Sequence, residues 1–250
     1  MRIRSLFVDY DGTIAPLGAP RSESRVFKDV EEELQKISLK VPVCVVTAKD
    51  FDFVHERCGF ASGWACASGL DVRLADGRTF SAKKLRDLKD ALDAASFGEG
   101  LGAQRELKHG PNGELLGVGI DWSHAQEAGA VLIGRVRSLS MAGHYVAFDG
   151  YSSFADIYAA PPNKGKAVKL LMRALGEDSC AMFIGDSEND NTAFREVDVA
   201  IGVNHGQPTG GLECGYFVEQ GRLAGFLRSL SGRGLDFTPR LSEVRTRGVD

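Results

Sequence analysis

The sequence predicts an α/β protein, a doubly wound parallel sheet into which a second, α+β domain is inserted. Short apolar runs without alternation occur at residues 3–8, 41–46, 181–184 and 199–203, as in strands that are buried on both faces. Segments with helical spacing of apolar residues separate several of these runs. Between about residues 80 and 160 this alternation is interrupted, which indicates an insertion.

The helices of the main sheet are expected where apolar residues recur every three or four positions. One helix is expected over residues 26–37, and another after Asn163, which is a favourable N-cap residue. In such a sheet, ligands bind beyond the carboxyl ends of the strands. Asp9, Thr47 and Asp186 stand at the ends of three apolar runs, so we expect them to face one crevice.

The middle of the chain is expected to form the inserted domain. A Lys-rich helix over 81–95 and a hairpin over 106–122 are followed by a helix over 125–139 and two strands over 145–158. This gives an αββ-αββ order. The expected boundaries are 1–80 and 160–232 for the discontinuous core domain, 81–159 for the inserted domain, and 233–250 for an irregular C-terminal tail.

Composition limits the classes of function. The chain has 250 residues, 30 basic and 34 acidic, with a formal net charge of −4, which argues against a generally basic nucleic-acid-binding protein. No apolar run approaches the roughly 20 residues that span a bilayer, and the N-terminus leads into a strand rather than a signal peptide. The five cysteines form no C-x-x-C pair, so we expect small buried side chains in a reducing compartment and no zinc site. We therefore expect a cytoplasmic protein that binds neither nucleic acid nor membrane; its oligomeric state is not predicted.

The strongest local signal is the segment Asp9-Tyr10-Asp11-Gly12-Thr13 at the end of the first apolar run. One carboxylate of such a pair can attack phosphorus and form an aspartyl-phosphate. The other can protonate the leaving oxygen and later deprotonate water. Two anions facing a phosphate need a cation, for which Mg²⁺ with oxygen ligands is suitable. The alternative is a plain strand-end turn, in which Asp-Gly is common.

Three further segments carry groups of matching chemistry. Residues 185–190, Gly-Asp-Ser-Glu-Asn-Asp, place acids and an amide in one loop, as a hard cation requires, or as a helix N-terminus favours. Thr47 can donate to a phosphate oxygen together with the amides of the following turn. Lys164, at a helix start, can neutralise a phosphoryl group. The alternative for both Thr47 and Lys164 is an ordinary solvent-exposed side chain without a part in binding.

The order and spacing of these four segments resemble the motifs of the haloacid dehalogenase superfamily of phosphotransferases. Residues 9–13 match D-x-D-G-T, Thr47 matches the second motif, Lys164 the third, and residues 185–190 match G-D-S-x-N-D. The resemblance covers most of the chain and implies a Rossmann-like core. The insertion between the second and third motifs resembles the type-B cap of class II members.

The resemblance also implies roles for individual residues. Asp9 would be the nucleophile and Asp11 the general acid/base. The implied ligands of Mg²⁺ are Asp9, the backbone carbonyl of Asp11 and Asp186, with Asn189 or Asp190 in support. The phosphoryl group would be bound by Thr47, Ala48 and Lys164.

The resemblance predicts a Mg²⁺-dependent phosphomonoesterase that acts on a small phosphorylated metabolite. Residues 6–17 resemble trehalose-6-phosphate phosphatases, so a sugar phosphate is the first expectation. Thr-Ala-Lys at 47–49 and the 185–190 loop are more similar to mannosyl-3-phosphoglycerate, sucrose or phosphoglycolate phosphatases, so these substrates remain alternatives. A sugar phosphomutase of the same superfamily and a non-catalytic binding module are further alternatives.

Because the core motifs bind only the phosphoryl group, the cap is expected to recognise the rest of the substrate and to close over it. Aromatic faces suit a sugar ring, and cations suit a carboxylate or second phosphate. The candidate specificity residues are Lys108, His109, Trp122, His124 and Tyr151. The alternative for each is a place in the cap's own core or on its solvated face.

Overall fold

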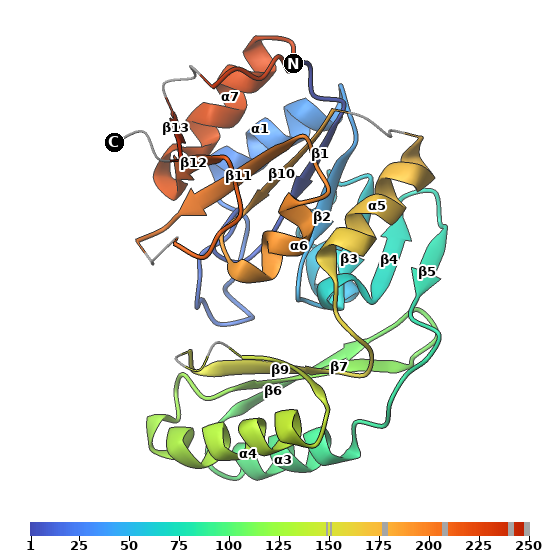
Figure 1. Ribbon diagram of the computed structural model, residues 1–250, viewed down its shortest axis with the longest axis vertical. Coiled ribbons are helices and arrows are strands. Elements are labelled where there is room, and N and C mark those ends of the chain that lie inside the picture. Colours follow the sequence, from blue (N-terminus) through green and yellow to red (C-terminus); the bar gives the residue numbers. More distant parts are fainter. Residues whose placement is uncertain (149, 151, 177–179, 207–209, 240–242, 248–250) are drawn as a thin grey trace.

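The computed structural model describes residues 1–250 except 149, 151, 177–179, 207–209, 240–242 and 248–250. Within the described residues, the chain folds around two sheets (Figure 1). The larger, core sheet contains, in spatial order, β13 (Val244–Thr246), β12 (Tyr216–Glu219), β11 (Val199–Asn204), β10 (Ala181–Gly185), β1 (Ser5–Val8), β2 (Val43–Val46), β3 (Gly63–Cys66), β4 (Asp71–Leu74) and β5 (Thr79–Ser81). The strands from β12 to β3 are parallel, and the others are antiparallel to their neighbours.

Helices cover both faces of the core sheet (Figure 1). Helix α1 (Lys28–Ser38) packs with α7 (Leu223–Gly232) on one face, where the short helix α2 (Phe51–His55) joins the same apolar cluster. Helices α5 (Lys164–Leu175) and α6 (Asn191–Phe194) cover the other face. Because both faces are covered, β1, β2 and β10 are buried at every position. This confirms the doubly wound α/β core predicted from the sequence.

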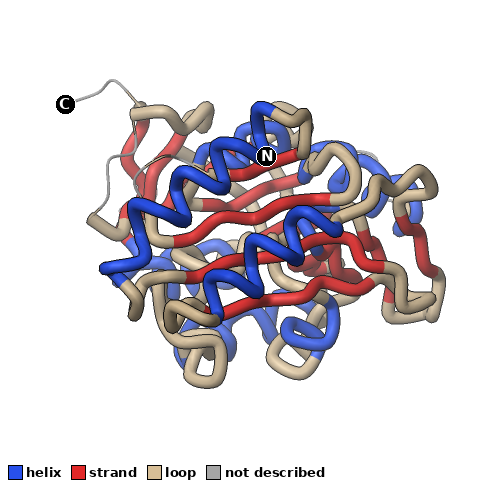
Figure 2. The backbone as a smooth tube through the Cα atoms, turned by 90° about the horizontal axis from the view of Figure 1, so that it is seen from below, coloured by secondary structure: helices blue, strands red, loops and turns tan. Residues whose placement is uncertain are grey.

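The smaller sheet forms the inserted α+β cap. Its strands are, in spatial order, β6 (Gln104–His109), β7 (Leu115–Asp121), β9 (Phe154–Tyr158) and β8 (Tyr145–Ala147), all antiparallel. Helices α3 (Lys89–Glu99) and α4 (Gly129–Met141) lie across its outer face (Figure 2), and its other face is turned towards the core (Figure 1). The chain order α3-β6-β7-α4-β8-β9 is the expected αββ-αββ succession.

The first cap helix begins later than the sequence predicted. Ser81 ends β5, and the Lys-rich stretch that follows is irregular rather than helical up to Leu88. The reason is a tertiary contact: the backbone N–H of Arg86 donates to the Ala159 carbonyl at 2.7 Å, so the two connections between core and cap run side by side. Helical backbone at Arg86 would not leave this N–H for the second connection.

The C-terminal tail is not irregular throughout, contrary to expectation. Val244–Thr246 forms β13, which pairs antiparallel with β12. Leu235 and Phe237 are buried, and the Phe237 ring packs edge-on against Tyr216 with centroids 5.0 Å apart. These apolar side chains cover the end of the sheet, and their burial fixes residues 235–237 against it.

The five cysteines are free, and all except Cys180 are buried, as expected for small core residues. Among the described residues, no helix combines the length and the apolar character that crossing a bilayer requires.

Candidate active site

Four segments of the chain meet at the carboxyl end of the parallel strands. From β1 the chain winds outwards to β2 and β3, and it later returns on the other side of β1 to form β10. The topological switch point therefore lies beside β1, where a doubly wound sheet opens a crevice. Asp9 follows β1, Thr47 follows β2, Asp186 follows β10, and Lys164 opens α5 next to them.

The centre of the crevice is a cluster of carboxylates with one cation. Asp9, Asp186 and Asp190 each place an oxygen within 4.8 Å of the others. The Lys164 ammonium lies 3.0 Å from Asp9 Oδ1 and 2.6 Å from Asp190 Oδ1. Burial raises the pKa of Asp9 against the attraction of Lys164, and the neighbouring carboxylates raise it further. The cluster therefore holds more negative charge than its lysine can balance.

Lys164 is kept charged by its neighbours. Burial alone would lower the pKa of Lys164, but the carboxylates of Asp190 and Asp9 outweigh burial and raise it. The side chain is fixed at the first turn of α5, whose N-cap Asn163 accepts a hydrogen bond from the backbone N–H of Lys166. A permanent cation therefore stands beside Asp9.

The loop after β10 uses Asp190 as an internal brace. Asp190 Oδ2 accepts hydrogen bonds from the backbone N–H groups of Asp186 and Ser187, while Oδ1 faces Lys164. A side chain at Gly185 could not coexist with this arrangement, because a Cβ there would lie 2.3 Å from Asp190 Oδ2. Asn189 is exposed on the same loop. Asp190 thus shapes the loop, and the oxygens of Asp186 and Asp190 both lie close to Asp9.

Asp186 is oriented by two side chains from other segments. Thr13 Oγ1 donates to Asp186 Oδ1 at 3.1 Å, and His205 Nε2 lies 2.9 Å from Oδ2. Gly12, with φ of +73°, allows this approach, since a Cβ there would meet Asp186 Oδ2 at 2.2 Å. His205 was missed by the sequence analysis, although it follows β11 and so satisfies the same strand-end rule that identified Asp9 and Asp186.

Asp11 occupies a different environment from Asp9. Its Oδ2 lies 3.7 Å from the Lys49 ammonium. Burial raises the pKa of Asp11, and the opposing effect of Lys49 does not cancel this rise. A carboxyl group with a raised pKa is suited to donating a proton near neutral pH. The two carboxylates of the Asp9–Asp11 pair thus differ in the cation beside them.

The segment that follows β2, residues 47–49, is a short and closely packed turn. Thr47 is buried, and its Oγ1 accepts a hydrogen bond from the backbone N–H of Lys49 at 3.2 Å. Ala48, between them, is partly exposed. Together with Lys164, this turn brings polar groups to the same edge of the sheet as Asp9.

The cap turns a charged face of its sheet towards the crevice. Alternation along β6 places Glu106 and Lys108 on this face, opposite Asp156 and Tyr158 of β9 across β7. The Lys49 ammonium lies 3.3 Å from Glu106 Oε1, so this lysine contacts both Asp11 and the cap. Core and cap are therefore joined by an ion pair directly above the crevice.

A second polar connection crosses from cap to core beside Asp9. Lys108 is completely buried and ion-paired with Asp156. The Tyr158 hydroxyl donates to Asp156 Oδ2 at 2.8 Å and lies 2.8 Å from Ser68 Oγ in the core. Ser68 holds a φ of 53°, which is uncommon outside glycine, so the turn that presents it is constrained. The cap is thereby fixed in a defined position over the site.

Of the four candidate specificity residues of the cap that lie in the described part of the chain, Lys108 alone faces the crevice. Trp122 is buried in the cap's own apolar core, beside Phe148, because alternation after Asp121 directs it to the helix-covered face. His109 and His124 are exposed, and neither has a side-chain hydrogen bond or ion pair to the four core segments within the described residues. Tyr151 lies outside the described residues.

No protein-family model and no curated protein matches the sequence. Solved structures do match the fold. The C-terminal domain of a trehalose-6-phosphate phosphatase from C. albicans is 15% identical with a TM-score of 0.73, over 92% of this chain and 93% of that one. A trehalose-6-phosphate phosphatase related protein is 17% identical with a TM-score of 0.67, over 92% and 98%. A sugar phosphatase of subclass IIB of the haloacid dehalogenase superfamily is 15% identical with a TM-score of 0.62, over 93% and 100%. The chain therefore has the fold of these phosphatases, a Rossmann-like core with a cap, as its motifs predicted.

Proposed function

We propose that this protein is a Mg²⁺-dependent phosphomonoesterase that hydrolyses a small phosphorylated metabolite through an aspartyl-phosphate on Asp9. The observation that carries the proposal is the pairing of two unlike carboxyl groups at the end of β1. The Asp9 side chain is 8% exposed and contacts Lys164, whereas the Asp11 side chain is 29% exposed and lies 3.7 Å from Lys49; burial raises the pKa of both carboxyl groups. One group is thus equipped as a nucleophile and the other as a proton donor.

The reaction follows from these positions. An oxygen of Asp9 attacks phosphorus, the bond from phosphorus to the leaving oxygen breaks, and Asp11 gives its proton to that oxygen. Water then attacks the aspartyl-phosphate, Asp11 takes a proton from it, and inorganic phosphate leaves with Asp9 restored. Lys164, Thr47 and the Ala48 turn hold the phosphoryl oxygens during both steps.

The donor set at the site suits a hard cation. Three carboxylates place oxygens within 4.8 Å of one another, two of them contact Lys164, and carboxylate oxygens are the ligands that Mg²⁺ prefers. Asp9, Asp186 and the Asp11 backbone carbonyl would hold the ion, with Asp190 bracing the loop and Asn189 at its rim. Bound there, Mg²⁺ would neutralise negative charge on the phosphoryl group.

The substrate class that we propose is a sugar phosphate of the trehalose-6-phosphate type. The structural neighbours named above include trehalose-6-phosphate and sugar phosphatases, which supports this class. The cap face above the crevice carries both acceptors and donors, in Glu106 and Lys108, which suits hydroxyl groups. Free, mostly buried cysteines are consistent with a reducing compartment, and we propose a cytoplasmic location.

A phosphate-release screen tests the proposal. Trehalose-6-phosphate, sucrose-6-phosphate, mannosyl-3-phosphoglycerate, phosphoglycolate and hexose phosphates are supplied with Mg²⁺, and inorganic phosphate is measured. We expect release from a sugar phosphate that is lost in Asp9→Asn. An isomeric sugar phosphate with little free phosphate would indicate a mutase instead. Binding of these compounds without any turnover would indicate a non-catalytic module. Turnover by Asp9→Asn at the wild-type rate would refute the assignment of Asp9 as the nucleophile.

A further inference from the structure

The turn after β3, residues 67–70, has an unusual backbone, and we call it the hinge turn. Ala67 and Ser68 are buried and hold φ of 47° and 53°. Within the described residues, no other two adjacent non-glycine residues both have a positive φ. Residues in such conformations persist where their surroundings hold them, and they occur often at functional sites. The contacts of the hinge turn are therefore informative.

The hinge turn is bonded to both segments that we propose to bind the phosphoryl group. The backbone N–H of Ser68 donates to the Thr47 carbonyl at 2.9 Å. The backbone N–H of Asn163, the N-cap of α5, donates to the Ser68 carbonyl at 2.8 Å, directly before Lys164. Gly69 allows this approach, because a Cβ there would lie 2.6 Å from the Asn163 carbonyl oxygen. The backbone positions of Thr47 and Lys164 thus depend on the hinge turn.

The same turn contacts the cap and both of its connections to the core. The backbone N–H of Ala82, where the first connection begins, donates to the Leu70 carbonyl at 2.9 Å. Side chains of the turn, the cap and the second connection form one buried apolar cluster: Ala67, Leu70, Leu116, Tyr158 and Ala160. Both covalent paths between core and cap therefore pass the hinge turn.

The Ser68 side chain is anchored to the cap. The Tyr158 hydroxyl has a single hydrogen, which it donates to Asp156 Oδ2 at 2.8 Å. Ser68 Oγ lies 2.8 Å from the Tyr158 oxygen, so Ser68 is the donor in this hydrogen bond. The backbone of Ser68 is thus bonded to the phosphate side of the core, and its side chain is bonded to the cap.

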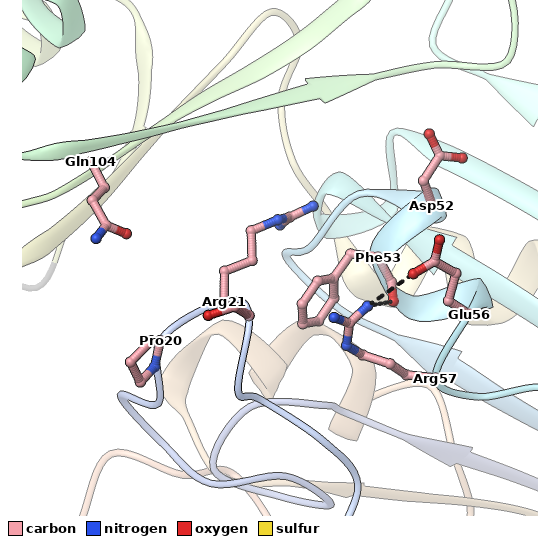
Figure 3. Close-up of a pocket in the computed structure, with 8 residues that line it drawn as sticks. Pro20, Arg21, Asp52, Phe53, Glu56, Arg57 and Gln104 are labelled. Atoms are coloured by element: carbon pink, nitrogen blue, oxygen red, sulfur yellow. Dashed lines mark hydrogen bonds and ion pairs between the residues drawn. The ribbon is translucent and has the colours of Figure 1, made fainter.

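At the opposite end of the cap sheet, a pocket of about 540 Å³ lies between cap and core. Gln104 of β6 lies level with Phe154, at the end of β9 remote from Tyr158. Figure 3 shows Gln104 apart from Arg21 and Phe53 of the core. The cap has room to turn about its connections at this end. Because Tyr158 belongs to the cap sheet, such a rotation would displace its hydroxyl from Ser68.

We propose that Ser68 is a positioning residue that makes phosphate binding depend on the position of the cap. While the Tyr158 hydroxyl is in place, the hinge turn keeps its left-handed conformation and holds Thr47 and Lys164. When the cap turns away, Ser68 loses this partner, the turn relaxes, and phosphate is bound more weakly. By linkage, phosphate in turn favours the closed cap. The inference rests on the proposed phosphatase function and adds a regulation of the same site.

Calorimetric titration of inorganic phosphate into the full-length protein with Mg²⁺ tests the inference. Tyr158→Phe removes the hydroxyl on the cap, and Ser68→Ala removes its donor. Each should weaken phosphate binding about fivefold, as the loss of one neutral hydrogen bond does. Tyr145→Phe is the matched control and should leave the affinity unchanged. Tyr145 lies opposite Tyr158 on β8, and within the described residues its hydroxyl makes no hydrogen bond to the core.

Ser68→Gly separates this coupling from a purely structural effect of Tyr158. Glycine adopts a φ of 53° without strain, so phosphate affinity should return to within about twofold of wild type. Adding Tyr158→Phe to Ser68→Gly should then change the affinity no further, whereas an effect exerted through Asp156 would persist. Phosphate should also slow amide exchange in the connections, residues 82–88 and 159–163, in the wild type but not in Ser68→Gly. This measurement decides the coupling even if Tyr158→Phe does not fold.

Three outcomes would overturn the inference. They are unchanged affinity in both Tyr158→Phe and Ser68→Ala, an equal effect of Tyr158→Phe with and without Ser68→Gly, and equal slowing of amide exchange in wild type and Ser68→Gly. Hydrolysis of p-nitrophenyl phosphate by the wild type is measured separately. Its absence would refute the phosphatase proposal while the phosphate titrations still decide the role of Ser68. Hydrolysis without measurable phosphate binding would overturn the role of Ser68 alone.

Discussion

Replacing Asp9 with Asn should abolish turnover and, in the absence of Mg²⁺, make the folded protein more stable at neutral pH. The amide cannot become an aspartyl-phosphate, so phosphate release should fall to background. The effect on stability follows from the raised pKa of Asp9, which burial and nearby carboxylates produce. The negative charge of Asp9, which the reaction needs, therefore lowers the stability of the folded protein.

The magnitude can be worked out from the distances. At an effective dielectric constant of about 20, two like charges 4.8 Å apart repel by about 3.5 kcal/mol, and Asp9 has two such neighbours within that distance. The attraction to Lys164 at 3.0 Å is worth about 5.5 kcal/mol on the same scale. Repulsion therefore exceeds attraction by about 1.5 kcal/mol before desolvation is added, and we expect a gain of about 1–3 kcal/mol for the amide. Lys164 keeps Asp190 as its partner in the variant.

The stability difference between Asp9→Asn and the wild type depends on pH. Because the folded pKa of Asp9 is raised, the native state binds the proton more tightly than the unfolded chain does. The wild type therefore loses stability as pH rises from about 3.8 through the folded pKa, and the advantage of Asp9→Asn should be present at pH 7 and absent near pH 3.5. Saturating Mg²⁺ should stabilise the wild type more than the variant, since it binds the native carboxylates.

The assay is urea unfolding of both proteins at the two pH values, with chelator and with Mg²⁺, beside a phosphate-release measurement. Asp76→Asn is the control. Asp76 is exposed, and its hydrogen bond to Arg78 lowers its pKa, so the amide there should bring no gain at pH 7. A variant at Asp9 that is less stable than wild type at pH 7 in chelator would refute the reasoning.

Three further predictions concern the remaining parts of the site. Asp11→Asn should slow hydrolysis of sugar phosphates far more than of p-nitrophenyl phosphate, since p-nitrophenolate leaves without a proton; equal losses in aspartyl-phosphate formation would contradict the acid role. Activity should need Mg²⁺ and fall with excess Ca²⁺, because Ca²⁺ accepts more ligands and so allows Asp9 to bind with both oxygens. Full activity after the metal is chelated would contradict the proposed Mg²⁺ requirement. Gly12→Ala should reduce Mg²⁺ affinity as well as turnover, because the new Cβ would lie 2.2 Å from Asp186 Oδ2 at a φ of +73°; unchanged affinity in a Mg²⁺ titration would count against this orientation of Asp186.

The fold and the location of the crevice could be predicted from the sequence because both depend on local patterns. Unbroken apolar runs indicated strands covered on both faces, and β1, β2 and β10 are indeed buried throughout. Parallel strands bring their carboxyl ends to one edge, so Asp9, Thr47 and Asp186 could be placed together without knowledge of the register. The αββ-αββ order of the cap followed from the same periodicities.

Tertiary packing alone decided which side chains of the cap reach the site. On a strand, neighbouring residues face opposite sides, so a shift of one position exchanges the two sets. Trp122 was a reasonable candidate by chemistry, but it turns into the cap's core, whereas Glu106 turns to Lys49.

The same holds for residues that gain a role through distant partners. Asp190 has the composition of a metal ligand, yet its oxygens are taken by Lys164 and by two backbone N–H groups of its own loop. Arg21 lies in the loop after β1, which shows no local pattern, and its contacts come from Asp50 and Phe53 of another core segment and from Glu106 of the cap. Such contacts depend on how whole domains pack against one another, so they cannot be predicted from a short stretch of sequence.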